Sequence, residues 1–193
     1  MLTKEKLRVK QIGDRQVVTD ENLHQFVYKN LGIKHKLKVN KEQVREQIVE
    51  KELLYHPLWL AKTFVIADRP PFSPKKIPNI IFVDAVSGYR GVFQKVPKMQ
   101  GIEIDEDCAV RKRIDKDDCE RKYLKDVQEN QINRSYILKK PRHEIVDVYP
   151  AYLPIWKVAV ESELFRETLY LNANTGEHEK YMSERWANGK DLL

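Results

Sequence analysis

Apolar residues recur near the start of the chain at the spacing that is typical of helices. Four of them stand at i, i+3, i+4 and i+8 and would share one helical face: Leu23, Phe26, Val27 and Leu31. Asp20 is a suitable N-cap for this helix. Asn40 is in turn a suitable N-cap for a second helix over residues 41–55. The pattern thus predicts two helices within the first third of the chain.

Other segments have the alternation and the β-branched or aromatic content that are typical of strands. Residues 59–67 and 77–86 form the clearest pair, and the proline-rich segment between them is predicted to be an extended loop. Lysines alternate with apolar residues over residues 33–40, which predicts a strand with one lysine face. Further strands are expected over residues 89–96, 143–149, 156–164 and 167–173, and a short hairpin over residues 6–18.

The sequence between the two halves of the chain has the pattern of a linker. Residues 99–114 carry no long apolar period and precede a helix that is predicted over about residues 116–136. We therefore expect a basic N-terminal module over residues 1–98, a linker, and a C-terminal module over residues 115–193.

Two short motifs occur twice in the same order. The first is Y-x-P-[LI]-W, and the second is an aromatic residue followed by an apolar residue and then [DN]-A-x-[ST]-G. Their key residues in the first copy are Tyr55, Pro57, Trp59, Asp84 and Gly88, and those in the second are Tyr152, Pro154, Trp156, Asn172 and Gly176. Such ordered recurrence indicates an internal duplication, with the proline-rich loop as an insertion in the first copy.

Each residue type in the motifs has a structural use. The proline blocks helix continuation, and the tryptophan can bury its ring under a helix while its N–H still needs a partner. The Asp or Asn can accept hydrogen bonds from its own turn, and the glycine supplies a positive φ. An isolated hairpin is only marginally stable. We therefore predict an α+β fold of two repeated units, each an antiparallel hairpin or meander packed against a helix.

The second copy, Trp156 to Glu177, resembles the second half of a PepSY domain, and Ile81 to Gly88 resembles it too. The family typically has Asp where this chain has Asn172, and it lacks the long proline loop of the first copy. The resemblance implies a helix laid on an antiparallel sheet. It also implies a non-catalytic module, usually found outside the membrane, that binds or restrains a partner, often a peptidase. It supplies no catalytic residues.

Composition narrows the class of protein. Apolar residues make up 41% of the 193 residues, which suffices for a packed core. No apolar run approaches the roughly 20 residues that span a bilayer. The basic N-terminus lacks the apolar stretch of a secretory signal. If the chain is complete, we expect a cytoplasmic protein.

Recognisable catalytic chemistry is absent from the sequence. The five histidines lack zincin spacing, and no phosphate-binding glycine loop or nucleophile elbow occurs. Cys108 and Cys119 are expected to be ordinary thiols, and acidic neighbours disfavour a reactive thiolate at Cys119. We expect no metal and no cofactor. An enzyme whose catalytic groups are scattered in sequence remains an alternative hypothesis.

Charge is unevenly distributed along the chain. The net charge is +6, with +9 over residues 1–100 and −3 over residues 101–193. The candidate anion-binding residues are Lys34, Lys36, Lys38, Lys75 and Lys76. A lysine-faced strand could follow phosphates, or it could protect a sheet edge from aggregation. The leading hypothesis is a binding or scaffold protein with a protein or peptide partner, and nucleic-acid or other polyanion binding is the alternative. The sequence leaves the oligomeric state open.

Overall fold

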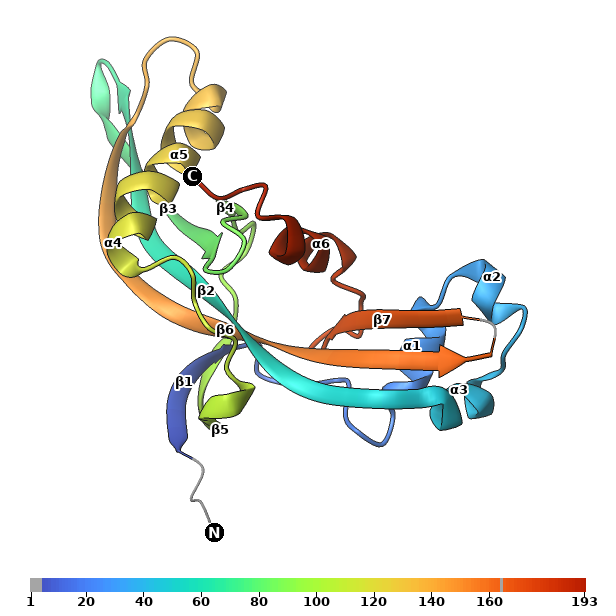
Figure 1. Ribbon diagram of the computed structural model, residues 1–193. Coiled ribbons are helices and arrows are strands. Elements are labelled where there is room, and N and C mark those ends of the chain that lie inside the picture. The colour runs from blue at the N-terminus through green and yellow to red at the C-terminus, as the bar shows by residue number, and fades with distance from the viewer. Residues whose placement is uncertain (1–4, 164) are drawn as a thin grey trace. The chain divides into compact units, whose positions relative to one another are not determined.

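A computed structural model describes residues 5–163 and 165–193 (Figure 1). Within these residues, seven strands form one mixed sheet in the order β4-β3-β2-β6-β1-β5, and β7 pairs with β6. The strands are β1 (Lys6–Ile12), β2 (Ile48–Arg69), β3 (Phe72–Asp84), β4 (Arg90–Val92), β5 (Met99–Asp105), β6 (Arg142–Ser162) and β7 (Phe165–Asn172). The helices labelled in Figure 1 are α1 (Leu23–Asn30), α2 (Ile33–Lys36), α3 (Lys41–Gln47), α4 (Lys116–Asp118), α5 (Lys125–Val127) and α6 (Lys180–Asn188). The predicted α+β class is confirmed.

Residue contacts divide the chain into two compact units that are interleaved in sequence. Unit 1 contains the described residues of Met1–His56, Lys98–Val110 and Tyr152–Glu184, and unit 2 contains Pro57–Pro97, Arg111–Ala151 and Arg185–Leu193. The long strands β2 and β6 each contribute one part to each unit. This division differs from the sequential boundary expected at residues 99–114.

The core of unit 2 lies between a helical segment and the β2–β3 hairpin (Figure 1). The segment runs from Lys116 to Ser135, includes α4 and α5, and has stretches of wider π-type hydrogen bonding at Cys119–Leu124 and Gln128–Ile132. Its first turn is capped by Asp115, whose Oδ1 accepts the backbone N–H of Asp118 at 2.8 Å. The buried residues that meet in this core include Trp59, Ala61, Ile81, Val83, Cys119, Tyr123, Leu124 and Val127. The helix predicted over about residues 116–136 is confirmed.

Unit 1 has a corresponding core between α1 and the β6–β7 hairpin. The helix begins at Leu23, so Asn22 rather than Asp20 stands at its N-cap, and no side-chain hydrogen bond caps it. The buried apolar residues of this core include Leu23, Val27, Leu31, Val158, Val160, Leu169 and Leu171. The apolar stripe predicted for this helix therefore faces the hairpin, as its period requires.

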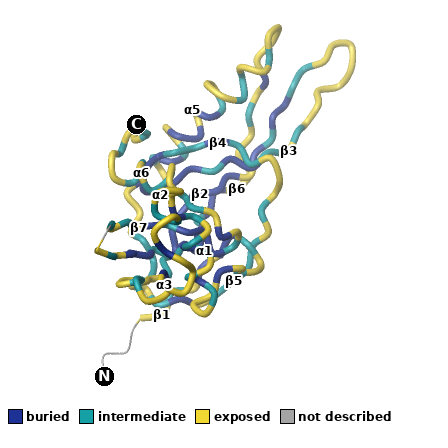
Figure 2. Tube along the Cα trace, turned by 90° about the vertical axis from the view of Figure 1, so that its right-hand side faces the viewer, coloured by how far each residue is buried: buried dark blue, intermediate teal, exposed yellow. Residues whose placement is uncertain are grey.

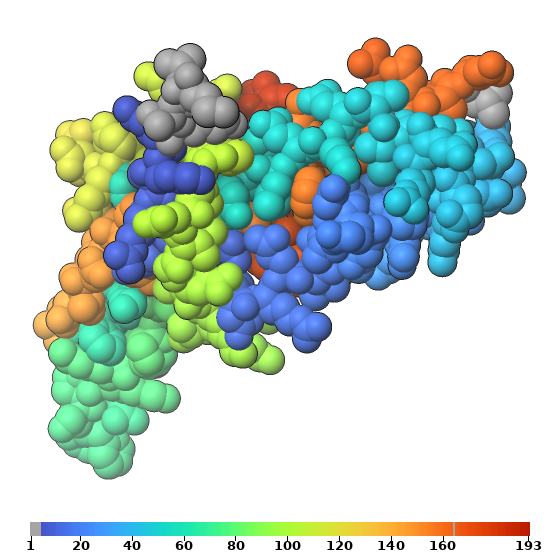
Figure 3. Space-filling view, turned by 90° about the horizontal axis from the view of Figure 1, so that it is seen from below, coloured from blue at the N-terminus to red at the C-terminus, as the bar shows by residue number. Residues whose placement is uncertain are grey.

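The expected linker contains a strand. Residues Met99–Asp105 form β5, which pairs antiparallel with β1 from Lys6 opposite Asp105 to Ile12 opposite Met99 (Figure 3). The predicted hairpin over residues 6–18 is therefore wrong, because β1 pairs with this distant strand. Ile102 and Ile104 alternate with a glycine and a glutamate, the period-2 pattern of a strand with one buried face.

The lysine-faced strand over residues 33–40 is also wrong. Residues Ile33–Lys36 form α2, a single helical turn in which the N–H of Lys36 donates to the carbonyl of Gly32 at 3.0 Å. Ile33 and Leu37 are 78% and 83% exposed whereas Val39 is buried, so the apolar residues of the pattern do not share one buried face. A strand needs a neighbour for its backbone groups, whereas a helical turn satisfies them locally.

Other helices and strands also begin or end at residues that differ from the predicted ones. Asn40 caps α3 through a reciprocal pair of bonds with Gln43, but α3 ends at Gln47 and β2 begins at the next residue, well before residue 55. The proline-rich segment is an exposed hairpin tip rather than a long loop, because β2 extends to Arg69 and β3 begins at Phe72 (Figure 2). The polar C-terminal segment, for which no helix was predicted, contains α6.

Candidate functional site

The first copy of the repeated turn lies at the end of β3 in unit 2. Oδ1 of Asp84 accepts the backbone N–H groups of Val86 at 2.8 Å and Ser87 at 3.1 Å. The N–H of Gly88 then donates to the carbonyl of Asp84 at 2.9 Å, and Gly88 has a φ of 78°. A Cβ at Gly88 would lie 2.5 Å from the carbonyl oxygen of Asp191, so both conformation and space require glycine here.

The second copy in unit 1 repeats this hydrogen-bond pattern. Oδ1 of Asn172 accepts the backbone N–H of Asn174 at 2.9 Å, and the N–H of Gly176 donates to the carbonyl of Asn172 at 2.7 Å. Gly176 has a φ of 74°. The alanine after the Asp or Asn donates its N–H to the motif proline in both units, Ala85 to Pro57 at 3.0 Å and Ala173 to Pro154 at 2.9 Å.

The two tryptophans occupy the same register within their hairpins. Trp59 pairs with Val83, and Trp156 pairs with Leu171. The indole N–H of Trp59 donates to the carbonyl of Ile114 at 2.9 Å, and that of Trp156 donates to the carbonyl of Val18 at 3.2 Å. Each acceptor lies just before the helix of its unit, so each indole ties the hairpin to the chain that enters this helix.

The acid or amide of each turn differs in its second partner. Oδ2 of the fully buried Asp84 accepts the indole N–H of Trp186 at 2.9 Å. The side-chain amide of Asn172 instead donates to Oε1 of Glu179 at 2.9 Å. A carboxylate therefore faces a donor in unit 2, whereas an amide faces an acceptor in unit 1. This difference in partners accounts for Asp84 in one turn and Asn172 in the other.

The two motif tyrosines are both buried in unit 1. Tyr55 and Tyr152 pack with Val9 of β1 and Ile104 of β5. Burial raises the pKa of both phenols, so they stay neutral over the physiological pH range.

All ten motif residues thus have structural positions, in turns or in the core, and none lines the cavities described below.

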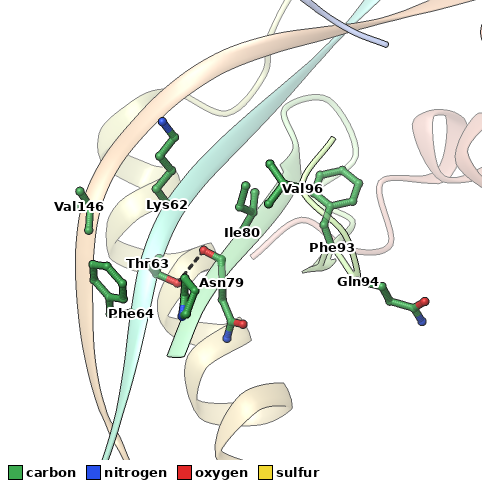
Figure 4. Close-up of a pocket in the computed structure, with 10 residues that line it drawn as sticks. Lys62, Thr63, Phe64, Asn79, Ile80, Phe93, Gln94, Val96 and Val146 are labelled. Carbon is green, nitrogen blue, oxygen red and sulfur yellow. Dashed lines mark hydrogen bonds between the residues drawn. The ribbon is translucent and has the colours of Figure 1, made fainter. Parts of the chain in front are cut away.

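An open groove lies on the β2–β3 hairpin of unit 2 (Figure 4). Its volume is about 400 Å³, within the range of about 300–1,000 Å³ that is typical of ligand sites. Phe64, Ile80, Phe93, Val96 and Val146 supply its apolar walls. These residues come from β2, β3, β6 and the segment after β4. The aromatic wall is supported by the contact of Phe93 with Phe82, whose rings are tilted by 42° with their centres 4.8 Å apart.

Lys62 is the one charged residue among those that line the groove in the described part of the chain. Its side chain is exposed, and its Nζ lies 5.5 Å from the centre of the Tyr149 ring. An aromatic ring attracts an ammonium group but leaves it able to bind an anion. The groove therefore combines apolar walls with an accessible positive charge. The sequence contains one signal for this groove. Lys62 and Phe64 are two positions apart in β2, so their side chains lie on the same face of the strand.

The five candidate anion-binding lysines are divided between the units, with Lys34, Lys36 and Lys38 in unit 1 and Lys75 and Lys76 in unit 2. Lys34, Lys38 and Lys75 are exposed, and none of them lines the groove. Lys76 forms an ion pair with Glu144 at 3.3 Å and lies over the ring of Phe64. Lys36 instead lies in a pocket of unit 1 together with two lysines that were not among the candidates, Lys29 and Lys41.

The two cysteines differ in burial. Burial raises the pKa of the Cys119 thiol to about 12, with a smaller contribution from the charge of Glu120, so this cysteine is a poor nucleophile. Cys108 is half-buried. Within residues 5–163 and 165–193, no three His, Cys, Asp or Glu side chains gather as metal ligands. None of the helices in this part of the chain is long and apolar enough to cross a membrane.

Comparison with models of protein families, with curated proteins and with solved structures finds no significant match to this chain.

Proposed function

We propose that this chain is a non-catalytic binding protein that holds an extended peptide segment of a protein partner in the groove of unit 2. The observation that carries the proposal is the pairing of apolar walls with the exposed ammonium group of Lys62. The occupant that fits this chemistry is a segment with apolar side chains next to an acidic side chain.

Apolar contacts should provide most of the affinity of the groove for a peptide, and Lys62 should provide its selectivity. Burying one large apolar side chain contributes about 1.5–3 kcal/mol. An ion pair that stays partly exposed contributes only about 0.4–1 kcal/mol. The carboxylate should therefore select among apolar segments and should increase affinity about two- to fivefold.

Addition of a strand along the whole free edge of β3 is a poorer mode of binding. β4 pairs with β3 only from Ile81 to Val83. Beyond that pairing, β3 contains Pro74 and Pro78, which have no N–H to donate to an added strand. Recognition through side chains in the groove is therefore the mode that we propose.

We also infer that the two units contain duplicated copies of one helix-and-hairpin motif that resembles the PepSY domain. The matching strand registers, turn hydrogen bonds and indole bonds support this inference. The core positions support it further, because Leu23, Val27 and Leu31 have the same spacing as Cys119, Tyr123 and Val127. A non-catalytic role in binding is what the resemblance to PepSY domains implies.

The experiment is selection of a random displayed peptide library on the full chain, on Lys62→Glu and on Lys75→Glu. Lys75 is the matched control, because it lies in the same hairpin, is exposed and lines no part of the groove. The wild type and Lys75→Glu should enrich the same peptides, in which an acidic residue stands beside apolar ones. Lys62→Glu should lose these peptides.

Two outcomes would contradict the proposal. One is the absence of any enriched peptide class on the wild type. The other is enrichment of the same acidic peptides by Lys62→Glu, because it would place the binding site away from the groove.

A further inference from the structure

A second pocket lies in unit 1, where three consecutive helices meet. Its volume is about 410 Å³, and it is lined by Gln25, Phe26, Tyr28, Lys29, Lys36 and Lys41. These residues come from α1, α2 and α3, so each helix contributes one lysine. The short α2 helix, in place of the predicted strand, is what brings Lys36 to this pocket.

The walls of the pocket are tied to the hairpin of unit 1. The ring of Phe26 packs against Gly176, where an added Cβ would collide with it. The side-chain amide of Asn30 donates to the carbonyl of Gly176 at 2.8 Å and to that of Phe26 at 2.9 Å. The position of α1, which carries two aromatic residues and one lysine of the pocket, is therefore fixed by the core motif.

The positive charge in this pocket is uncompensated. No carboxylate lines it, and none of its three lysines has a salt bridge within the described part of the chain. Lys36 is held in place, because its Nζ donates to the carbonyl of Lys29 at 2.7 Å and lies 6.0 Å from the centre of the Tyr28 ring. Like charges on three lysines that line one pocket repel one another, and a bound anion would relieve this repulsion.

We propose that this pocket binds a small ligand with two or more phosphate groups attached to a planar ring, the chemistry of a nucleoside di- or triphosphate. The three ammonium groups match the charge of a polyphosphate, and ammonium groups bind phosphate oxygens as point charges. Tyr28 and Phe26 offer apolar ring surface for a base, and Gln25 offers one amide for hydrogen bonding. This site lies in unit 1 and is independent of the peptide groove proposed for unit 2.

The test is calorimetric titration of the full chain with inorganic pyrophosphate and with ATP in the absence of metal. Saturable binding of both is expected, with ATP the tighter of the two. Lys29→Glu/Lys41→Glu should weaken both ligands roughly tenfold or more. The matched control is Lys34→Glu/Lys38→Glu, which changes the net charge equally in the same segment but leaves the pocket lining intact, and it should keep most of the affinity.

A second variant separates the ring from the phosphates. Tyr28→Leu should weaken ATP more than pyrophosphate, because it removes aromatic surface and leaves the three lysines in place. The proposal is overturned if neither ligand binds at millimolar concentration or if the two double variants lose affinity equally. Tighter binding of an oligothymidylate that rises with its length would also overturn it, because that result indicates a nucleic-acid surface.

Discussion

The choice of Asp84 in one turn and Asn172 in the other allows a sharp test of the two units. Asp84→Asn would place an amide N–H₂ against the indole N–H of Trp186, two donors where the native structure has a donor and an acceptor. Asn172→Asp would place a carboxylate against the carboxylate of Glu179. Both changes conserve volume, so their effects report on polar pairing rather than on packing.

The expected magnitude follows from burial. Asp84 is fully buried, and a hydrogen bond to a charged group contributes about 1.5–3 kcal/mol. The bonds from the backbone N–H groups to Oδ1 survive in Asp84→Asn, so the free energy of unfolding should fall by about 2 kcal/mol. Asn172→Asp should cost a similar amount at neutral pH. Its deficit should shrink below about pH 5, where one of the two carboxyl groups can take up a proton.

The assay is urea unfolding of each variant, followed by circular dichroism. Adding Glu179→Gln to Asn172→Asp gives the carboxylate a donor again and should recover about 1 kcal/mol or more. Glu179→Gln alone keeps an acceptor for the native amide and serves as the control. Changes below about 0.5 kcal/mol, or no recovery in the double variant, would refute the pairing argument.

Three further predictions follow from single contacts. Trp59→Phe and Trp156→Phe should each lower the free energy of unfolding, measured in urea, by about 1–3 kcal/mol, because each leaves a carbonyl without its indole donor. Unchanged stability in both variants would contradict the role of the indoles as anchors. Because burial raises the pKa of Cys119 to about 12, one thiol, that of Cys108, should react with Ellman's reagent at pH 8 in the native protein and two in denaturant. The hydrogen bond from Arg90 to Asp126 lowers the pKa of that carboxyl below its unfolded value of about 3.9. The contribution of the ionised carboxylate to stability is therefore complete above about pH 4 and is lost as the pH falls through the folded pKa. In an acid titration, Asp126→Asn should lose less of its free energy of unfolding than the wild type.

Local patterns predicted the elements that carry their own signals. The stripe of Leu23, Val27 and Leu31 predicted a helix, and the β-branched run that includes Trp59 predicted a strand. Each signal lies within one segment, and burial of one face is enough to produce it. The turn residues were predictable for the same reason, since Asp84 and Gly88 act within a few positions of each other.

These local patterns do not predict which distant segments pair with each other. Residues 99–105 pair with β1, which lies almost a hundred positions earlier in the chain. The local sequence of neither segment indicates which segment is its partner. The lysines at residues 34, 36 and 38 fit strand alternation, yet this segment pairs with none of the strands in the described part of the chain and forms a helical turn. The groove was missed because Lys62, Phe93 and Val146 become neighbours only after β2, β3 and β6 assemble.

The most direct test of the peptide groove is an NMR titration of the labelled full chain with two blocked tripeptides, Leu-Glu-Phe and Leu-Gln-Phe. The account predicts saturable shifts at the methyl groups of Ile80, Val96 and Val146, with about two- to fivefold weaker binding of the glutamine peptide. Equal affinity for the two peptides, or saturable shifts confined to residues outside the groove, would contradict it.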